Sequence, residues 1–142
     1  MNSFHLDIIT PQRQAFSEEV EAVTVPTSQG SVGVLAHHEP LFSELTEGEI
    51  KILSGAKEYY LAIGGGFMEV TKKGVSILVS RAVHADELNE TEIKRAQEQA
   101  KEALSARVKG VELSQAQAIL RRSLLELKVY RRRKHASPSL SN

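Results

Sequence analysis

The spacing of hydrophobic residues divides the chain into two parts. Up to residue 85, short apolar stretches such as 20–25 contain β-branched residues that alternate with polar ones, and turn-forming residues separate the stretches. This pattern is typical of strands in an antiparallel β-sandwich or barrel. No helical pattern lies between the stretches, which argues against a parallel α/β sheet.

Two breaks between apolar stretches have the residues of β-hairpin turns. One break, at 72–74, ends in glycine and separates the stretches 66–71 and 75–79. The other break, at 54–57, contains Gly55. Glycine adopts the positive φ that a tight hairpin turn requires, so we predict a hairpin at each break.

After residue 86 the apolar spacing changes to three and four residues, which is typical of helices with one buried face. Gly110 is the expected stop of the first helix, and Glu112 suits the positive end of the second helix dipole. The pattern therefore predicts an antiparallel helical hairpin. The residues on this spacing are Ile93, Ala96, Ala100, Ala103 and Arg107 in the first helix, and Leu113, Ala116, Leu120, Leu124 and Leu127 in the second.

Alanine lines the predicted contact face of the first helix. It lets the partner helix approach closely but buries little apolar area, and burial contributes only about 25 cal/mol per Å². We therefore expect a hairpin that is weakly stabilised and weakly packed against the β-domain. The predicted domains are a two-sheet antiparallel β-sandwich at 1–86, a helical hairpin at 87–134 and a disordered tail at 135–142.

The composition is that of an ordinary globular protein, with 41% apolar and 25% charged residues among 142. The absence of cysteine excludes disulfides, zinc–thiolate sites and thiol catalysis. No apolar run approaches the length of about 18 residues that a membrane helix needs. The segment 1–7 lacks the features of a signal peptide, so we expect a cytoplasmic protein.

The chain has no net charge, but its charges are unevenly distributed. Residues 1–85 carry a net −4, residues 86–142 a net +4, and the segment from Leu113 onward a net +6. Such a basic segment favours an acidic partner, although most charged helix faces are only solvated. Nucleic-acid binding through 131–134 is opposed by the acidic first part and by an aromatic content of 5%.

The sequence contains no set of residues with the spacing of a catalytic or metal site. The adjacent residues His37 and His38 would point to opposite faces of a strand. The segment 64–66 has strand-like residues on both sides, which indicates a bulge or close backbone approach rather than a phosphate loop. We therefore predict a binding or coupling role without catalysis. The histidines are His5, His37, His38, His84 and His135.

Four segments carry a resemblance to a known family. In order along the chain they are 5–11, 30–41, 65–70 and 75–78. The second reads Gly-Ser-Val-Gly-Val-Leu-Ala-His-His-Glu-Pro-Leu, and the third reads Gly-Gly-Phe-Met-Glu-Val. Together, in register, they resemble the epsilon subunits of bacterial-type F-type ATP synthases, over about residues 4–130.

The resemblance implies a rotor subunit of the central stalk that couples ion translocation to ATP synthesis and is not itself an enzyme. Its β-sandwich would bind the gamma subunit and rest on the c-subunit ring. The enzyme would lie at the cytoplasmic face of the bacterial plasma membrane, with this chain peripheral to the bilayer. The residues implied in these contacts are Ser31, His38, Glu39 and Leu41.

The same resemblance makes the helical hairpin a mobile inhibitor. Folded down, the hairpin would pack on the sandwich; extended, it would enter the alpha/beta head and block ATP hydrolysis. Its basic segment would meet an acidic segment of the beta subunit. The residues assigned to this contact are Arg121, Arg122, Lys128, Arg131, Arg132 and Arg133.

Two departures from the family pattern bear on the implied contacts. Ser31 replaces the usual glutamate, which weakens the case for a polar contact with the ring there. Some relatives bind ATP on the hairpin, but Asn89 replaces the aspartate of that motif and the spacing is longer. We expect weak or absent ATP binding and no other cofactor. The residues that remain as ATP contacts are Arg95, Ala96 and Arg122.

Two other interpretations remain open from the residues, a stand-alone adaptor and a small nucleic-acid-binding protein. A stand-alone β-sandwich adaptor with a helical interaction arm would need no gamma subunit. The mitochondrial counterpart of the family, called delta, shares the fold but usually carries an N-terminal transit segment, which we do not find here.

Overall fold

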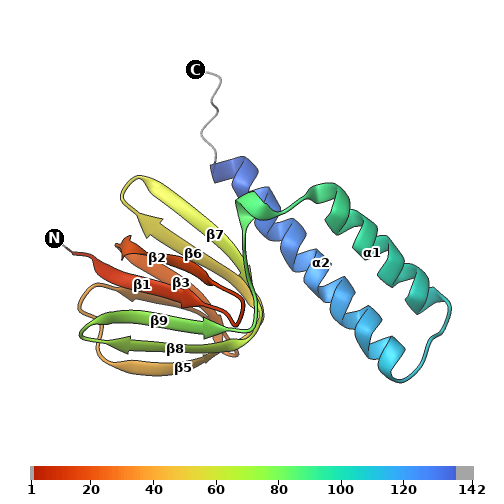
Figure 1. The fold of residues 1–142 in the computed structure, drawn as a ribbon, viewed down its shortest axis with the longest axis horizontal. Coiled ribbons are helices and arrows are strands. Elements are labelled where there is room, and N and C mark those ends of the chain that lie inside the picture. The colour runs from red at the N-terminus through yellow and green to blue at the C-terminus, as the bar shows by residue number, and fades with distance from the viewer. Residues whose placement is uncertain (1, 137–142) are drawn as a thin grey trace, which may run out of the picture. The chain divides into compact units, whose positions relative to one another are not determined.

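The computed structural model describes residues 2–136, with side chains through Arg132. It consists of two compact units, Met1–His84 and Ala85–Asn142. The first is built of strands and the second of helices (Figure 1). This confirms the predicted fold class, a two-sheet sandwich followed by a helical hairpin. Of the tail expected at 135–142, residues 137–142 lie outside the described part, whereas His135 and Ala136 belong to the last helix.

The β-unit contains two five-stranded sheets, ordered β2-β1-β9-β8-β5 and β10-β7-β6-β3-β4. Neighbouring strands are antiparallel except β1 and β9, which pair in parallel. The strands are β1 (Phe4–Ile9), β2 (Gln14–Val20), β3 (Ala22–Thr27), β4 (Gly30–Leu35), β5 (Leu41–Leu45), β6 (Gly48–Ser54), β7 (Lys57–Ile63), β8 (Gly66–Thr71), β9 (Gly74–Val79) and β10 (Ala82–His84).

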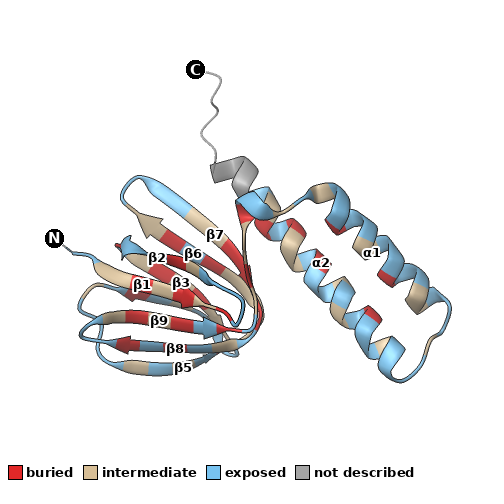
Figure 2. Ribbon diagram, in the orientation of Figure 1, coloured by how far each residue is buried: buried red, intermediate tan, exposed pale blue. Residues whose placement is uncertain are grey.

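The core of the sandwich comes from alternate residues of both sheets (Figure 2). In β1, Leu6 and Ile8 are fully buried, and Ile50, Leu61 and Ile77 on other strands join them. Complete burial of one such side chain contributes about 2 kcal/mol. The alternation therefore sets which face of each strand points inward.

The chain changes sheets at Glu21, within the stretch that the sequence predicts as a single strand. Val20 ends β2 in one sheet, and β3 begins at Ala22 in the other. Glu21 donates its backbone N–H to the carbonyl of Leu53 at 2.8 Å. The single-strand prediction is wrong because valines on both sides of the crossing bury into the same core, so the apolar pattern runs through the bend.

Both predicted hairpins are present, β6–β7 and β8–β9. Gly55 (φ 62°) and Gly74 (φ 141°) have the positive φ that the turns require. A Cβ on Gly74 would also lie only 2.5 Å from the carbonyl oxygen of His5. The turn at Gly74 is thus specified by its backbone conformation and by its close approach to β1.

The helical unit contains a short 3-10 helix η1 (Ala85–Glu87), then α1 (Glu90–Ser105) and α2 (Val111–Ala136). Asn89 caps α1, because its side chain accepts a hydrogen bond from the N–H of Glu92 at 3.1 Å. Ile93 and Ala100 are buried in α1. No helix within the described residues is long and apolar enough to cross a bilayer.

The first helix ends earlier than the sequence predicts. It stops at Ser105, and Arg107 lies beyond its end in the left-handed conformation (φ 57°). The N–H groups of Ala106 and Arg107 reach the carbonyls of Glu102 and Leu104. Gly110, the expected stop, instead has φ 64° directly before α2. The prediction that Arg107 belongs to the first helix is therefore wrong. The chain leaves the helix through the left-handed conformation of Arg107, three residues before Gly110.

One leucine on the predicted buried face of α2 is exposed. Leu124 is 53% exposed, whereas Ala116, Ser123 and Leu127 are buried. The hydroxyl of Ser123 donates to the carbonyl of Ile119 at 2.7 Å, so this polar side chain is satisfied within its own helix. The prediction that Leu124 is buried is therefore wrong. The neighbouring Ser123 is buried instead, with its hydroxyl hydrogen-bonded within α2.

Candidate interaction surfaces

The residues implied in gamma and ring contacts are spread along one edge of the sandwich. Ser31 is exposed near the start of β4, and His38 and Glu39 are exposed in the β4–β5 connection. Ser31 is separated from the end of β4 by four residues, each of which extends the strand by about 3.3 Å. Leu41 begins β5 and packs against the core. The structure thus brings His38 and Glu39 together but places Ser31 at the other end of β4.

The histidine pair lies in a turn rather than on a strand. His37 has φ 66°, and the Nδ1 of His38 lies 2.6 Å from the carbonyl oxygen of Glu39. The expectation of opposite strand faces is therefore wrong. Among the described residues, no group of three His, Cys, Asp or Glu side chains is arranged to hold a metal ion.

The segment 64–66 is a close backbone approach, as the sequence indicated. A Cβ on Gly66 would collide with the carbonyl oxygen of Leu78, and one on Gly64 with the hydroxyl of Ser80. The segment connects β7 to β8, so no helix follows it. It therefore lacks the strand-to-helix geometry of a phosphate loop.

An exposed apolar surface lies on the outer face of β5, β8 and β9. We call it the outer aromatic patch, and it comprises Phe42, Phe67 and Leu78, with exposed fractions of 67%, 45% and 54%. The rings of Phe42 and Phe67 stack with centroids 5.4 Å apart and planes 19° apart. Phe67 pairs with Leu78 in the β8–β9 register. Such a cluster on a protein surface is typical of a binding site.

The outer aromatic patch was not predicted from the sequence, although the sequence carries a signal for it. Phe67 and Met68 are adjacent apolar residues, and so are Ile77 and Leu78. Neighbouring strand residues point to opposite faces, so one of each pair must lie outside. Met68 and Ile77 are fully buried, which leaves Phe67 and Leu78 outside.

A serine, a histidine and an aspartate meet on the outer face of β1 and β2, but not as a catalytic triad. The Nε2 of His5 lies 3.1 Å from both Asp7 Oδ1 and Ser17 Oγ, and Ser17 donates to Asp7 at 2.6 Å. A triad needs the serine and the aspartate on opposite ring nitrogens. Here they share one nitrogen. The hydrogen bond from Ser17 lowers the pKa of Asp7.

The basic side chains assigned to the alpha/beta head belong to α2. Arg121, Lys128 and Arg132 are exposed and recur at spacings of seven and four, which places them on one helix face. Arg122 and Arg131 are also exposed but lie to either side of that face. The side chain of Arg133 lies outside the described residues.

The residues that the resemblance leaves as expected ATP contacts do not form a charged pocket. Arg95 and Arg122 are exposed, and Ala96 lines a groove of about 320 Å³ between α1 and α2. The groove lining includes the carboxylate of Glu112, and within the described residues it contains no lysine or arginine. A triphosphate would meet a negative charge there without a compensating cation.

Comparison with known proteins identifies the family. A family model described as the beta-sandwich domain of the ATP synthase Delta/Epsilon chain matches residues 3–85. The chain belongs to this family. The ATP synthase epsilon chain of Herpetosiphon aurantiacus is 39% identical over 130 residues, which cover 92% of this chain and 96% of that one. The epsilon chain of Dehalococcoides mccartyi is 38% identical over 137 residues, covering 95% and 98%.

Solved structures show the same fold. A chain of the Euglena gracilis mitochondrial ATP synthase (OSCP/F1/c-ring) superposes with a TM-score of 0.66 at 24% identity, covering 94% of this chain and 81% of that one. A chain of the Tetrahymena thermophila mitochondrial ATP synthase (central stalk/c-ring) gives 0.55 at 15%, covering 89% and 96%. Membership of the epsilon family confirms the resemblance seen in the sequence and the prediction of a non-catalytic ATP synthase subunit.

Proposed function

We propose that the chain is the epsilon subunit of a bacterial-type ATP synthase, where it links gamma to the c-subunit ring in the central stalk. It would couple ion translocation to ATP synthesis and inhibit ATP hydrolysis through its hairpin. The observation that carries this proposal is that epsilon chains match nearly the whole chain, helices included. The protein would be peripheral at the cytoplasmic face of the plasma membrane.

The outer aromatic patch is the surface best suited to gamma. Phe42 and Phe67 stack on each other but leave much of their area in water. A partner that covers both rings would gain the burial of two large apolar side chains, which often dominates binding at an interface. The exposed His38–Glu39 turn, by contrast, offers polar contacts suited to the c ring.

Hairpin inhibition is supported by the basic face of α2 and by the small side chains between the helices. The buried residues of the α1–α2 contact include Ala100 and Ala116, which bury little area. The hairpin can therefore open at modest free-energy cost. Because the described residues that line the groove beside Ala96 include no lysine or arginine, we propose that ATP binds weakly or not at all and that no cofactor is needed.

Co-elution with gamma tests the proposal. The purified chain and the gamma subunit of the same genome should form a stable complex in size-exclusion chromatography. Phe42→Thr/Phe67→Thr should weaken the complex by at least about thirtyfold, because the loss of even one central aromatic contact, worth about 2 kcal/mol, corresponds to that factor. Threonine keeps the β-propensity of both strands.

A matched control removes two exposed apolar side chains from the helical unit. Val111→Thr/Ile119→Thr should leave the gamma complex intact. Failure of the unaltered chain to bind gamma would favour the stand-alone adaptor. Equal weakening by both double variants would show that gamma does not dock on the outer aromatic patch.

A further inference from the structure

Strand β5 lies at an edge of its sheet (Figure 1). The strand order β2-β1-β9-β8-β5 places β8 on one side of it and no described strand on the other. The N–H and C=O groups along such an edge can pair with another chain. The strand itself, Leu41–Leu45, contains neither proline nor lysine, the residues that often block this pairing.

Main-chain hydrogen bonds determine which groups of β5 point toward β8. The N–H of Ser80 donates to the carbonyl of Gly65 at 3.1 Å, just beyond the end of the β8–β9 register. The groups of an antiparallel strand alternate in direction, so the odd-numbered residues of β8 face β9 and the even-numbered ones face β5. The even-numbered residues of β8 pair with Leu41, Ser43 and Leu45.

Phe42 and Glu44 therefore direct their main-chain N–H and C=O groups away from β8. Thr46, which follows in the same alternation, agrees with this direction, because its N–H donates to the carbonyl of Pro26 in the other sheet at 3.1 Å. The hydroxyl of Ser43 reaches the carbonyl of Glu44 at a long 3.4 Å. Within the described residues no other hydrogen bond reaches these groups, so they are open to a partner strand.

The open edge is continuous with the outer aromatic patch. The side chains of Phe42 and Glu44 are exposed on the outer face, where Phe42 stacks on Phe67. A strand added to β5 would extend this face, and the Cβ of its residue opposite Phe42 would lie about 4.5–5.5 Å from the Cβ of Phe42. An apolar side chain at that place would cover the ring. The edge and the patch thus form one surface.

The rim of this surface is acidic. Glu44 pairs with Phe67 and Glu69 pairs with Phe42 in the β5–β8 register, so both carboxylates lie beside the stacked rings. Both are exposed, and neither forms an ion pair with a described residue. A partner segment with lysine or arginine opposite Glu44 would complement this charge.

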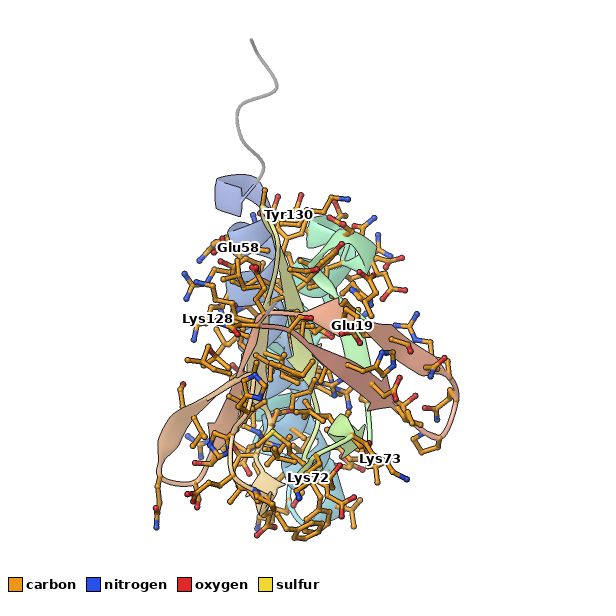
Figure 3. The ribbon with its side chains drawn as sticks, turned by 90° about the vertical axis from the view of Figure 1, so that its left-hand side faces the viewer. Glu19, Glu58, Lys72, Lys73, Lys128 and Tyr130 are labelled. Atoms are coloured by element: carbon orange, nitrogen blue, oxygen red, sulfur yellow. The ribbon has the colours of Figure 1, made fainter. Side chains whose placement is uncertain are left out.

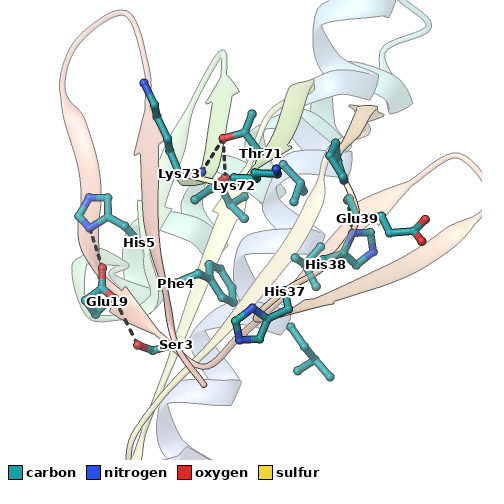
Figure 4. A pocket seen from close by; sticks show the side chains of 16 residues that line it. Ser3, Phe4, His5, Glu19, His37, His38, Glu39, Thr71, Lys72 and Lys73 are labelled. Atoms are coloured by element: carbon teal, nitrogen blue, oxygen red, sulfur yellow. Dashed lines mark hydrogen bonds and ion pairs between the residues drawn. The ribbon is translucent and has the colours of Figure 1, made fainter. Parts of the chain in front are cut away.

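The other end of the β8–β9 hairpin lacks this selectivity. Lys72 and Lys73 form its turn, four residues of β8 beyond Phe67 (Figure 3). The turn lines a cavity of about 650 Å³ together with β1 and the β4–β5 connection (Figure 4). The cavity lining carries Glu19 and Glu39 as well as both lysines, so it favours neither sign of charge.

We propose that gamma adds an extended segment to the β5 edge. This inference rests on the proposed function and describes how gamma docks on the outer aromatic patch. The gamma main chain hydrogen-bonds to Phe42 and Glu44, an apolar side chain covers Phe42, and a lysine or arginine two residues away lies opposite Glu44. Residues two apart share a face of a strand, so one extended segment supplies both side chains. In such strand addition, main-chain hydrogen bonds supply affinity and alternate side chains supply specificity.

Proline at position 44 tests the main-chain contact. Glu44→Pro removes the open N–H, whereas Glu44→Thr, the matched control, removes the same carboxylate and keeps the N–H. An edge strand accepts proline where the N–H faces away from the sheet. In calorimetric titrations, Glu44→Pro should bind gamma at least about tenfold more weakly than Glu44→Thr, because a hydrogen bond is lost and the ring obstructs the added strand.

Hydrogen exchange in the unaltered chain tests the same contact without a substitution. The amides of Phe42 and Glu44 should exchange rapidly in the free chain and at least about tenfold more slowly in the gamma complex, as measured residue by residue with mass spectrometry. The amides of Met68 and Val70, which face β5, show whether Glu44→Pro keeps the sheet intact. If they exchange faster in that variant, the exchange of the unaltered chain decides alone.

The outcomes separate this contact from the proposed function. Failure of gamma to bind the unaltered chain would overturn both. A gamma complex in which the amides of Phe42 and Glu44 still exchange rapidly, or equal affinity of the two position-44 variants, would overturn strand addition alone and leave gamma bound through side chains. An affinity that does not fall as salt is raised would overturn the basic side chain opposite Glu44.

Discussion

At the scale of single residues, the hydrogen bond between Ser17 and Asp7 affects a measurable property, the pKa of the Asp7 carboxyl group. The hydroxyl of Ser17 donates to it, and this hydrogen bond is the main reason that the pKa of Asp7 falls below 3.8; His5 lowers it further, while partial burial acts in the opposite direction. A carboxylate whose pKa is lowered by folding stabilises the native state above its unfolded pKa. That stabilisation is lost as pH falls through the folded value.

Ser17→Ala should therefore raise the pKa of Asp7, which an NMR titration of its carboxyl carbon measures directly. At about pH 7 we expect a loss of about 0.5–1 kcal/mol in the free energy of unfolding, because the hydrogen bond to the charged form is partly exposed. The loss should shrink in acid, as pH falls through the lowered pKa of Asp7 and the carboxyl protonates. The control is Ser31→Ala, which removes an exposed serine that has no carboxylate partner among the described residues and should leave the pKa of Asp7 unchanged. An unchanged pKa of Asp7 in Ser17→Ala would contradict the assignment.

At the scale of elements, the end of α1 shows how a helix can stop without glycine. Arg107 takes the left-handed conformation (φ 57°), in which its Cβ crowds the following backbone. Glycine at such a position avoids this cost. The short loop before α2 therefore keeps a strained residue although Gly110 stands three positions away.

Replacement of that residue tests the strain. Arg107→Gly should stabilise the helical hairpin by about 0.5–1 kcal/mol, after allowance for the greater freedom of glycine in the unfolded chain. Slower amide hydrogen exchange in the last turn of α1 and in α2 would measure it. Arg95→Gly, within α1, should instead destabilise by about 0.5–1 kcal/mol. If both variants sped up exchange alike, Arg107 would not be strained.

At the scale of the whole molecule, the two units differ in how much core each one has. The sandwich buries a continuous cluster of large aliphatic side chains such as Ile50 and Ile77. The contact between α1 and α2 relies on Ala100 and Ala116 beside few larger side chains. A unit with little buried apolar area opens at lower free energy, which is what the proposed inhibitory role requires.

The inhibitory role proposed for the helical unit predicts a response to charge reversal. Arg121→Glu/Lys128→Glu/Arg132→Glu inverts one face of α2 and should raise ATP hydrolysis by the reconstituted enzyme several-fold, because it would repel an acidic target. The control, Lys94→Glu/Arg95→Glu/Lys101→Glu, inverts three exposed charges of α1 and should leave hydrolysis inhibited. Unchanged hydrolysis in the α2 variant would reject electrostatic docking.

The sequence alone predicted the sandwich, the helical hairpin and the family. A strand or helix that buries one face has apolar residues at every second position or at every third to fourth position. These are local patterns, so they can be recognised in the sequence. The turns at Gly55 and Gly74 were also predictable, because the positive φ that each turn requires depends on the identity of a single residue. Ordered family segments such as 30–41 added the identity of the subunit.

Only the tertiary structure decided which of these residues meet. The stacking of Phe42 on Phe67 exists because β5 pairs with β8, a pairing between distant segments that no local pattern specifies. The exposure of Leu124 depended on Ser123 satisfying its hydroxyl within α2. The cavity beside Lys72 and Lys73 likewise forms between segments that are distant in the sequence, among them β1, the β4–β5 connection and the β8–β9 hairpin. Surfaces and cavities depend on long-range pairing, and a sequence records that pairing only indirectly.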